Sequence, residues 1–227
     1  MKIGILQTGL APDELKSSFG EYPAFFERLL AGKGFSFQSW SVVENVFPGG
    51  PEEADGWLIT GSKHGAYEDH PWIPPLEQLI RDIMDAGRPL IGVCFGHQII
   101  AQALGGTVRK YEGGWVVGQQ EYVFGGETLT LNAWHQDQVI KAPEGARVVA
   151  HGSHCANAAL LYPGRAFTVQ PHPEYGDDFI AGLIDARGKG LVPDALLEQA
   201  SADMGTPLDS ARMADQFAGF FRERTLS

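Results

Sequence analysis

Residues 89–106 read PLIGVCFGHQIIAQALGG, and this stretch decides the fold. The apolar run RPLIGVC (88–94) is typical of a buried strand, and FGHQIIAQALGG (95–106) is typical of a helix that ends at glycines. Cys94 lies between the two, where the predicted strand turns directly into the predicted helix. A structural cysteine normally packs as a small hydrophobe inside such an element. The position of Cys94 therefore points to a role for its thiol.

The pattern Gly92-x-Cys94-x-Gly96 is typical of a nucleophile elbow. Glycines are needed on both sides because the neighbouring backbones come too close for side chains. The turn exposes the central side chain at the carboxyl edge of the sheet, where open α/β folds bind ligands. A helix N-terminus at the same place favours a thiolate. The alternative is a packing cysteine in a glycine-rich turn.

The sequence before the elbow alternates between predicted strands and helices. Strands are predicted for KIGIL (2–6), FSFQSWSVV (35–43) and DGWLITGS (55–62), and helices for PAFFERLLAGKG (23–34) and WIPPLEQLIRDIMDAG (72–87). This alternation predicts a parallel sheet that is covered by helices on both faces.

The rhythm changes after residue 106. Strands are predicted over 108–124, 127–140, 146–155 and 158–170, and helices over 177–188, 193–205 and 210–224. The later strands fit an antiparallel extension of a mixed sheet. We expect one domain, with an α/β part over 1–175 and a helical C-terminal extension over 176–227.

Composition excludes several classes of function. The chain has 227 residues and a formal net charge of −11, which argues against a nucleic-acid partner. It has no signal-peptide pattern and no apolar run long enough for a membrane helix. Two cysteines in unlike surroundings, Cys94 and Cys155, do not suggest a disulfide framework. We expect a cytoplasmic protein without nucleic-acid or membrane partners.

A thiol nucleophile needs a base, and QPHPE (170–174) offers one. His172 and Glu174 are two residues apart, so in an extended segment their side chains share a face. Glu174 can then accept a hydrogen bond from the imidazole and fix its tautomer. The flanking prolines disfavour a helix there. A cysteine elbow followed by an extended His-Pro-Glu predicts a catalytic set of Cys94, His172 and Glu174.

These two motifs, GVCFGHQ (92–98) and HPE (172–174), resemble the signatures of class I glutamine amidotransferases. TGSKHGAYEDHPWI (60–73), FGHQIIAQALGG (95–106) and AWHQDQV (133–139) are similar to stand-alone members related to γ-glutamyl peptidases. The resemblance implies a flavodoxin-like open mixed sheet, mostly parallel, with helices on both faces. It implies that residues 1–175 form the catalytic domain and that no cofactor is needed.

The resemblance also implies a mechanism. Cys94 attacks the γ-carbonyl of glutamine or of a γ-glutamyl group, His172 transfers the proton, and Glu174 orients His172. The γ-glutamyl thioester is then hydrolysed. The backbone N–H of Phe95 is the first expected oxyanion donor, and the second comes from Gly61 or Ser62. Many family members have two glycines where this chain has Gly61-Ser62.

By the same resemblance, three further residues belong to the substrate site. Gln98 lies one helical turn from Cys94, and His135 belongs to a segment that lines the pocket beside the substrate's α-amino and carboxyl groups. Trp134 is either part of that pocket or part of the core. The sequence HGSHC (151–155) holds three possible ligands, His151, His154 and Cys155, but no fourth, so no metal site is expected.

Three functions remain open from the sequence. The first is hydrolysis of a γ-glutamyl amide bond in glutamine or another free small molecule. The second is a glutaminase subunit that delivers ammonia to a separate synthetase chain. The third is a catalytically silent binding protein on the same fold, which the complete set of Cys94, His172 and Glu174 disfavours.

Overall fold

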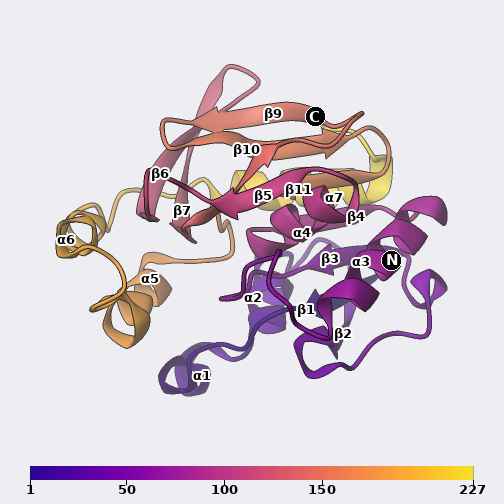
Figure 1. Ribbon diagram of the computed structural model, residues 1–227, viewed down its shortest axis with the longest axis horizontal. Helices are drawn as coiled ribbons and strands as arrows, with labels where there is room; N and C mark the ends of the chain where they lie inside the picture. Colours follow the sequence, from indigo (N-terminus) through magenta and orange to yellow (C-terminus); the bar gives the residue numbers. More distant parts are fainter. Residues whose placement is uncertain (227) are drawn as a thin grey trace.

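The computed structural model describes residues 1–226. A mixed sheet in the order β2-β1-β3-β4-β11-β10-β9-β6-β7 runs through the molecule (Figure 1). Its strands are β1 (Lys2–Gln7), β2 (Ser36–Ser41), β3 (Gly56–Ile59), β4 (Leu90–Val93), β6 (Val116–Phe124), β7 (Glu127–His135), β9 (Arg147–Gly152), β10 (Cys155–Tyr162) and β11 (Ala166–Val169). A small separate sheet pairs β5 (Thr107–Lys110) with β8 (Asp137–Lys141).

The part of the main sheet from β2 to β11 is parallel, and the part from β11 to β7 is antiparallel. Parallel strands follow one another through helices, as the alternation in the first half of the sequence predicts. The antiparallel extension comes from the later strands. The predicted fold class, an α/β fold with an open mixed sheet and a parallel core, is confirmed.

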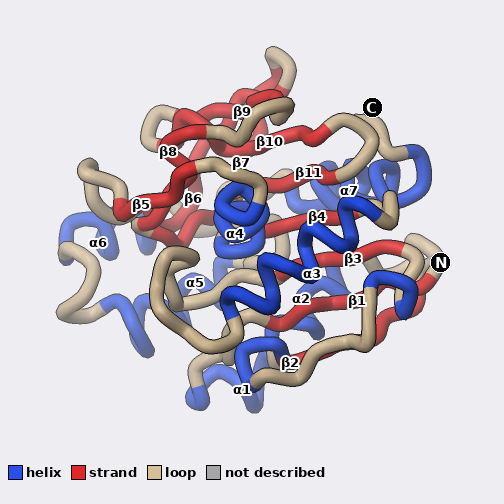
Figure 2. The backbone as a smooth tube through the Cα atoms, turned by 45° about the vertical axis from the view of Figure 1, so that its right-hand side comes forward, coloured by secondary structure: helices blue, strands red, loops and turns tan. Residues whose placement is uncertain are grey.

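Helices cover both faces of the parallel part (Figure 2). They are α1 (Asp13–Phe19), α2 (Tyr22–Leu29), α3 (Ile73–Asp85), α4 (Phe95–Ala103), α5 (Asp177–Leu183), which continues as a π-helical turn (Ile184–Gly188), α6 (Asp194–Ala202) and α7 (Ser210–Glu223); short 3₁₀ turns lie at Val42–Glu44 and Pro51–Glu53. Buried side chains of α2 and α7 share one apolar cluster, and those of α3 and α4 share another.

Side chains of β4 are divided between the two apolar clusters, one on each face of the sheet. Ile91 and Val93 are fully buried in the cluster of α2 and α7, whereas Leu90 is buried in the cluster of α3 and α4. Successive side chains of a strand point to opposite faces, so a strand buried on both faces reads as a continuous apolar run. Each fully buried aliphatic side chain contributes about 1.5–3 kcal/mol. The run that precedes Cys94 is therefore anchored on both sides.

Three of the predicted strands are divided in the structure. The one over 158–170 forms β10 and β11, which pair as antiparallel neighbours in the main sheet. The segment 127–140 forms β7 and β8, which meet at Gln136 but belong to different sheets. The segment 108–124 is likewise broken at Gly113-Gly114, which lies between β5 of the small sheet and β6 of the main sheet. Val108 and Val139 pack in the cluster of α4, so the small sheet contributes to the same core. An alternating pattern predicts strands but not which sheet they join.

The last helix joins the core of the α/β part. Met213, Phe217 and Phe220 are fully buried, and the Phe217 ring lies 5.8 Å from that of Phe167 in β11. A division at residue 175 stays a prediction. Within residues 1–226, no helix is both long and apolar enough to cross a membrane.

Candidate functional site

Cys94 occupies a sharp turn between β4 and α4. Its φ of 52° and ψ of −103° are strained for a residue with a side chain. Its N–H donates to the Val169 carbonyl at 2.9 Å, so β11 holds the turn in place. A Cβ at Gly92 would stand 2.6 Å from the backbone of Gly96, and one at Gly96 would stand 2.3 Å from the Ile59 carbonyl oxygen. The backbones therefore require both glycines that flank Cys94.

His172 and Glu174 form a buried pair. The Nδ1 atom of His172 lies 2.7 Å from Oε1 of Glu174, and the two side chains are 3% and 2% exposed. The His172 N–H donates to the Asn132 carbonyl at 2.8 Å, which ties this segment to β7. The imidazole stacks on the Tyr175 ring with centroids 4.0 Å apart. The extended His-Pro-Glu geometry predicted from the sequence is thus present.

One cavity of about 270 Å³ joins Cys94 and His172. Cys94 and His172, far apart in the sequence, both line it. The expected site residues Ser62, Gln98, Trp134 and His135 line it as well. Gly61 lies beside it, because a Cβ there would be 3.8 Å from the Cβ of Cys94. The structure therefore gathers the expected residues around a single opening at the carboxyl edge of the parallel strands.

Two neighbouring groups stabilise the charged form of His172. Burial by itself would lower the pKa of His172, but the charges of Glu174 and Cys94, with their hydrogen bonds, raise it to about 10. An imidazole that keeps its proton at neutral pH can pair with a thiolate and later donate that proton to a leaving group. The electrostatics of the pair thus suit nucleophilic catalysis.

The loop that follows β3 is pinned beside this pair. The Thr8 hydroxyl lies 2.9 and 3.1 Å from the carbonyl oxygens of Thr60 and Gly61, to which it donates, and Thr8 and Thr60 are fully buried just after β1 and β3. The Ser62 hydroxyl accepts the N–H of His64 at 3.2 Å. Phe95, the first residue of α4, follows Cys94 directly on the other side. The roles of Phe95, Gly61 and Ser62 as oxyanion donors stay predictions.

Two of the expected substrate residues have their side chains held by the protein. Gln98 is 2% exposed, and its Nε2 donates to the Asp137 carbonyl at 2.8 Å and to Oε1 of Gln170 at 3.1 Å. Trp134 packs against apolar clusters, with its ring 6.3 Å from that of Trp115, and it also lines the cavity. The sequence left open whether Trp134 belongs to the core or to the pocket, and in the structure it does both.

His135 presents an unused nitrogen. Its Nδ1 lies 3.2 Å from the Asp137 carbonyl, which can only accept, so Nδ1 carries the proton. Burial first, and the positive charge of His172 second, lower the pKa of His135 to about 3, so the ring is neutral. Its Nε2 is buried and has no hydrogen-bond partner in residues 1–226. His135 lines the cavity, so this buried acceptor belongs to a residue of the cavity wall.

Sequence reasoning missed several residues of the site. Tyr175 stacks on the base, Asn132 holds its backbone, and Tyr22, Lys110 and Arg187 line the cavity. Tyr175 directly follows Glu174 in the sequence, and this adjacency is the one feature that could have indicated that Tyr175 belongs to the site. The other contacts join segments that are distant in the chain.

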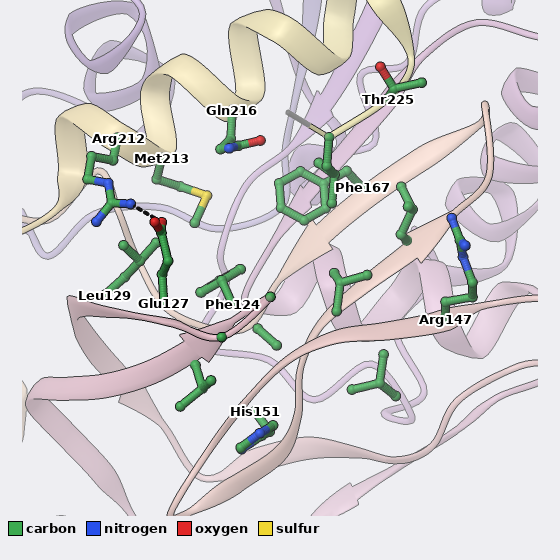
Figure 3. A pocket seen from close by; sticks show the side chains of 18 of the residues that line it. Phe124, Glu127, Leu129, Arg147, His151, Phe167, Arg212, Met213, Gln216 and Thr225 are labelled. Carbon is green, nitrogen blue, oxygen red and sulfur yellow. Dashed lines mark hydrogen bonds and ion pairs between the residues drawn. The ribbon is translucent and has the colours of Figure 1, made fainter.

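A larger cavity of about 920 Å³ lies elsewhere in the molecule. It is bounded by α7, by β9 and by the turn between β6 and β7, with Met213 on one wall and His151 on another (Figure 3). Arg212 of α7 pairs with Glu127 across it. Neither cysteine lines this cavity. Size alone therefore does not identify the site, and the smaller cavity holds the reactive groups.

Comparisons with known proteins agree with this geometry. The model of the class I glutamine amidotransferase family matches residues 43–178. γ-Glutamyl peptidase 4 of Arabidopsis thaliana is 33% identical over 186 residues, 75% of this chain and 74% of that protein. A GMP synthase of Macrococcus caseolyticus is 32% identical over 148 residues, which are 57% of this chain but 27% of the synthase.

A solved structure supports the fold. The glutamine amido transferase of Methylobacillus flagellatus superposes with a TM-score of 0.76 at 22% identity, covering 98% of this chain and 93% of its own. The family match spans the elbow and the His-Pro-Glu segment. This chain belongs to the class I glutamine amidotransferase family and is a cysteine-dependent amidohydrolase of that type.

Proposed function

We propose that this protein hydrolyses the γ-glutamyl amide bond of a free small molecule, with Cys94 as nucleophile and His172 and Glu174 as its partners. The observation that carries the proposal is the strained Cys94 turn in the same cavity as a buried His172–Glu174 pair. Backbone strain at a site-lining residue is typical of functional positions. The similarity to a γ-glutamyl peptidase supports the choice of substrate class.

The first half of the proposed reaction forms a thioester. The Cys94 thiolate attacks the γ-carbonyl carbon, and the carbonyl π electrons move onto oxygen, which the N–H of Phe95 and of Gly61 or Ser62 would stabilise. Protonated His172 gives its proton to the departing nitrogen as the C–N bond breaks. The amine leaves, and the γ-glutamyl group remains on the sulfur.

The second half releases the acid. His172, now neutral, takes a proton from a water molecule, whose oxygen attacks the thioester carbonyl. The C–S bond breaks, and the γ-carboxyl product leaves with the thiolate restored. Glu174 accepts the hydrogen bond from Nδ1 of His172 at both stages, so that the opposite ring nitrogen stays directed at the reaction.

Recognition of the γ-glutamyl group would use the cavity wall. The unpartnered Nε2 of His135 suits a donor such as the substrate's α-ammonium group. Gln98, held by its own hydrogen bonds, would shape the pocket floor, and Trp134 would offer an apolar surface. Buried, preorganised groups of this kind give orientation at little entropic cost.

Steady-state kinetics with the purified chain test the proposal. Glutamine, glutathione and a panel of γ-glutamyl amides serve as substrates, and ammonia and glutamate release are followed separately. We expect at least one γ-glutamyl compound to be turned over better than glutamine, with a γ-glutamyl adduct on Cys94 detected by mass spectrometry after rapid acid quenching. Failure of every compound to react would contradict the proposal.

A second candidate is a glutaminase subunit for a separate synthetase chain. The partial match to a GMP synthase favours it, because the shared segment covers only about a quarter of that longer protein. Such a subunit would stay nearly idle until its partner orders the site. Glutaminase activity that appears only when cell extract is added would select this candidate. Two unpaired cysteines support a cytoplasmic location as part of either proposal.

A further inference from the structure

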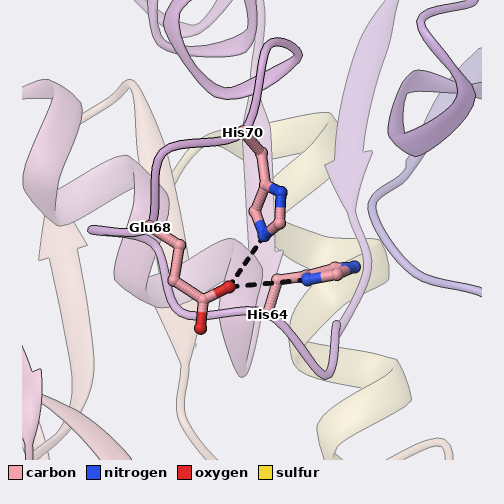
Figure 4. A group of neighbouring side chains, drawn as sticks. All are labelled: His64, Glu68 and His70. Atoms are coloured by element: carbon pink, nitrogen blue, oxygen red, sulfur yellow. Dashed lines mark hydrogen bonds and ion pairs between the residues drawn. The ribbon is translucent and has the colours of Figure 1, made fainter.

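The loop between β3 and α3 gathers two histidines and a glutamate, and the proposed reaction uses none of the three. Glu68 Oε2 lies 2.7 Å from Nε2 of His70 and 3.5 Å from Nδ1 of His64 (Figure 4). One potential ligand atom from each side chain lies within 4.8 Å of the others. The side chains are 21%, 44% and 31% exposed for His64, Glu68 and His70, so an ion from solvent can reach them.

The loop that carries these side chains is preorganised. Backbone hydrogen bonds of 3.0 Å run from Glu68 N to the Gly65 carbonyl and from His70 N to the Glu68 carbonyl. The Ala66 carbonyl accepts a bond of 2.6 Å from Gln102 of α4, which ties the loop to the helix of the elbow. A ligand set on a fixed backbone loses little conformational entropy when it binds an ion.

The rings are held by packing as well. The His70 ring stacks on that of Trp72 at 5.7 Å with an interplanar angle of 10°, and Trp72 is 3% exposed. The His64 ring stands edge-on to His70 at 4.3 Å. Packing on a buried tryptophan keeps both imidazoles on the side of Glu68.

From this arrangement we infer that His64, Glu68 and His70 form a binding site for a divalent transition-metal ion of the Zn²⁺ class. Two imidazole nitrogens and one carboxylate oxygen are a ligand set that Zn²⁺ and its neighbours accept, with further positions open to water or to another ligand. Mg²⁺ and Ca²⁺ prefer sets made of oxygen and are disfavoured here. The sequence did not indicate this site. The one segment considered as a metal site there was HGSHC (151–155), which lies elsewhere in the chain.

The position of the cluster connects it with the proposed active site. His64 and Glu68 line the cavity that contains Cys94 and His172. The backbone N–H of His64 is bound by the Ser62 hydroxyl, in the loop expected to provide an oxyanion donor. A bound ion would therefore occupy the cavity wall. The metal site itself does not depend on which substrate the cavity takes.

The test must separate this site from the thiol, since a thiolate beside an imidazole also attracts Zn²⁺. Full-length Cys94→Ala protein is therefore titrated with Co²⁺, followed by its visible absorption, and with Zn²⁺, followed by calorimetry. We expect one ion per chain, proton release on binding and an increase in Tm with Zn²⁺. Mg²⁺ should cause none of these changes.

Variants in the same background assign the ligands. His70→Phe keeps an aromatic ring for Trp72 but removes the ligand nitrogen, and Glu68→Gln removes the carboxylate charge. Each should weaken Zn²⁺ binding by more than the roughly 10–100-fold cost of losing an outer-shell partner. The matched control is His151→Ala, which removes an exposed imidazole from β9 and should bind as tightly as its parent.

Circular dichroism and the Tm without metal show whether each variant is folded. A folded His70→Phe or Glu68→Gln protein that binds Zn²⁺ as tightly as its parent would overturn the site. So would the absence of any Co²⁺ or Zn²⁺ binding by the Cys94→Ala protein. Hydrolytic activity toward γ-glutamyl compounds is measured separately on the parent chain, so a failure of the proposed function leaves the metal result interpretable.

Discussion

The α-carbon of Gly61 faces the imidazole of His172 so closely that a Cβ at position 61 would stand 2.8 Å from the His172 Cε1 atom. Real Cβ atoms essentially never approach so near, and His172 is buried and stacked on Tyr175, so it cannot easily move aside. The glycine thus sets the position of the base as well as the path of the loop.

Gly61→Ala should therefore lower kcat/KM by about 10²-fold, because a shift of about 1 Å in a reacting group can cost that much. The matched control is Gly219→Ala in α7, where a Cβ would meet nothing within 4 Å. That control should keep full activity and gain about 0.4–1 kcal/mol of stability. Steady-state kinetics and thermal unfolding check both variants. Equal activity of Gly61→Ala and the parent would contradict the role given to this contact.

The cysteines should differ in reactivity. Both thiols are nearly buried, at 4% and 3% exposed, but Cys94 lines a cavity beside His172, whereas burial raises the pKa of Cys155 to about 12. Electrophilic glutamine analogues should label Cys94 and spare Cys155. Cys94→Ala should fold normally and lose activity by roughly 10³-fold or more. Peptide mapping of the labelled protein decides the question, and prior labelling of Cys155 would show that the nucleophile is misassigned.

The sequence predicted the parts of the site that are formed by residues close together in the chain. The elbow needs Gly92 and Gly96 within one turn of Cys94, and the His172–Glu174 pair needs only an extended segment, so local geometry determines both. The stacking of His172 on Tyr175 and the unpartnered Nε2 of His135 depend on how segments that are distant in the chain pack together. No local pattern encodes that packing.

The same limit explains the errors in the strands and why the sequence did not indicate that His64, Glu68 and His70 lie together. β7 and β8 look like one strand in the sequence because their apolar alternation continues across Gln136, but β8 pairs with β5 in a separate sheet. His64, Glu68 and His70 look like scattered polar residues in a loop. Their convergence depends on backbone turns at Gly65 and on the buried Trp72. The parallel core, in contrast, followed directly from the buried runs.

The dependence of kcat/KM on pH should reflect the ion pair between His172 and Glu174. In the proposed reaction His172, with a pKa of about 10, acts as general acid in its protonated form, so kcat/KM should hold through neutral pH and fall as pH rises through about 10. The negative charge of Glu174 contributes to that raised value. Glu174→Gln removes the charge, so the His172 pKa falls and the alkaline limb moves to lower pH. We expect this variant to lose roughly 10²-fold in kcat/KM, less than Cys94→Ala.

Profiles of kcat/KM across the neutral and alkaline range, measured for the parent and Glu174→Gln, check this expectation. A variant that loses activity only through a disturbed fold would show a lower plateau with an unchanged alkaline limb. An unchanged alkaline limb would therefore show that the charge of Glu174 does not raise the pKa of His172, whatever the size of the activity loss.

The last prediction concerns the vacant acceptor on His135. Because Nδ1 donates to the Asp137 carbonyl and the ring is neutral, Nε2 can only accept a hydrogen bond. A γ-glutamyl substrate carries an α-ammonium donor, and the matching glutaryl amide lacks it. Removing that group from the substrate should lower kcat/KM by about 10–100-fold in the parent, the usual cost of a hydrogen bond to a charged group. In His135→Leu, which has no acceptor, the same removal should cost little, so the two substrates converge. The four kcat/KM values form a double-mutant cycle, with His151→Ala as the control that keeps the full difference. A difference of equal size in His135→Leu and in the parent would place the α-ammonium group elsewhere in the cavity.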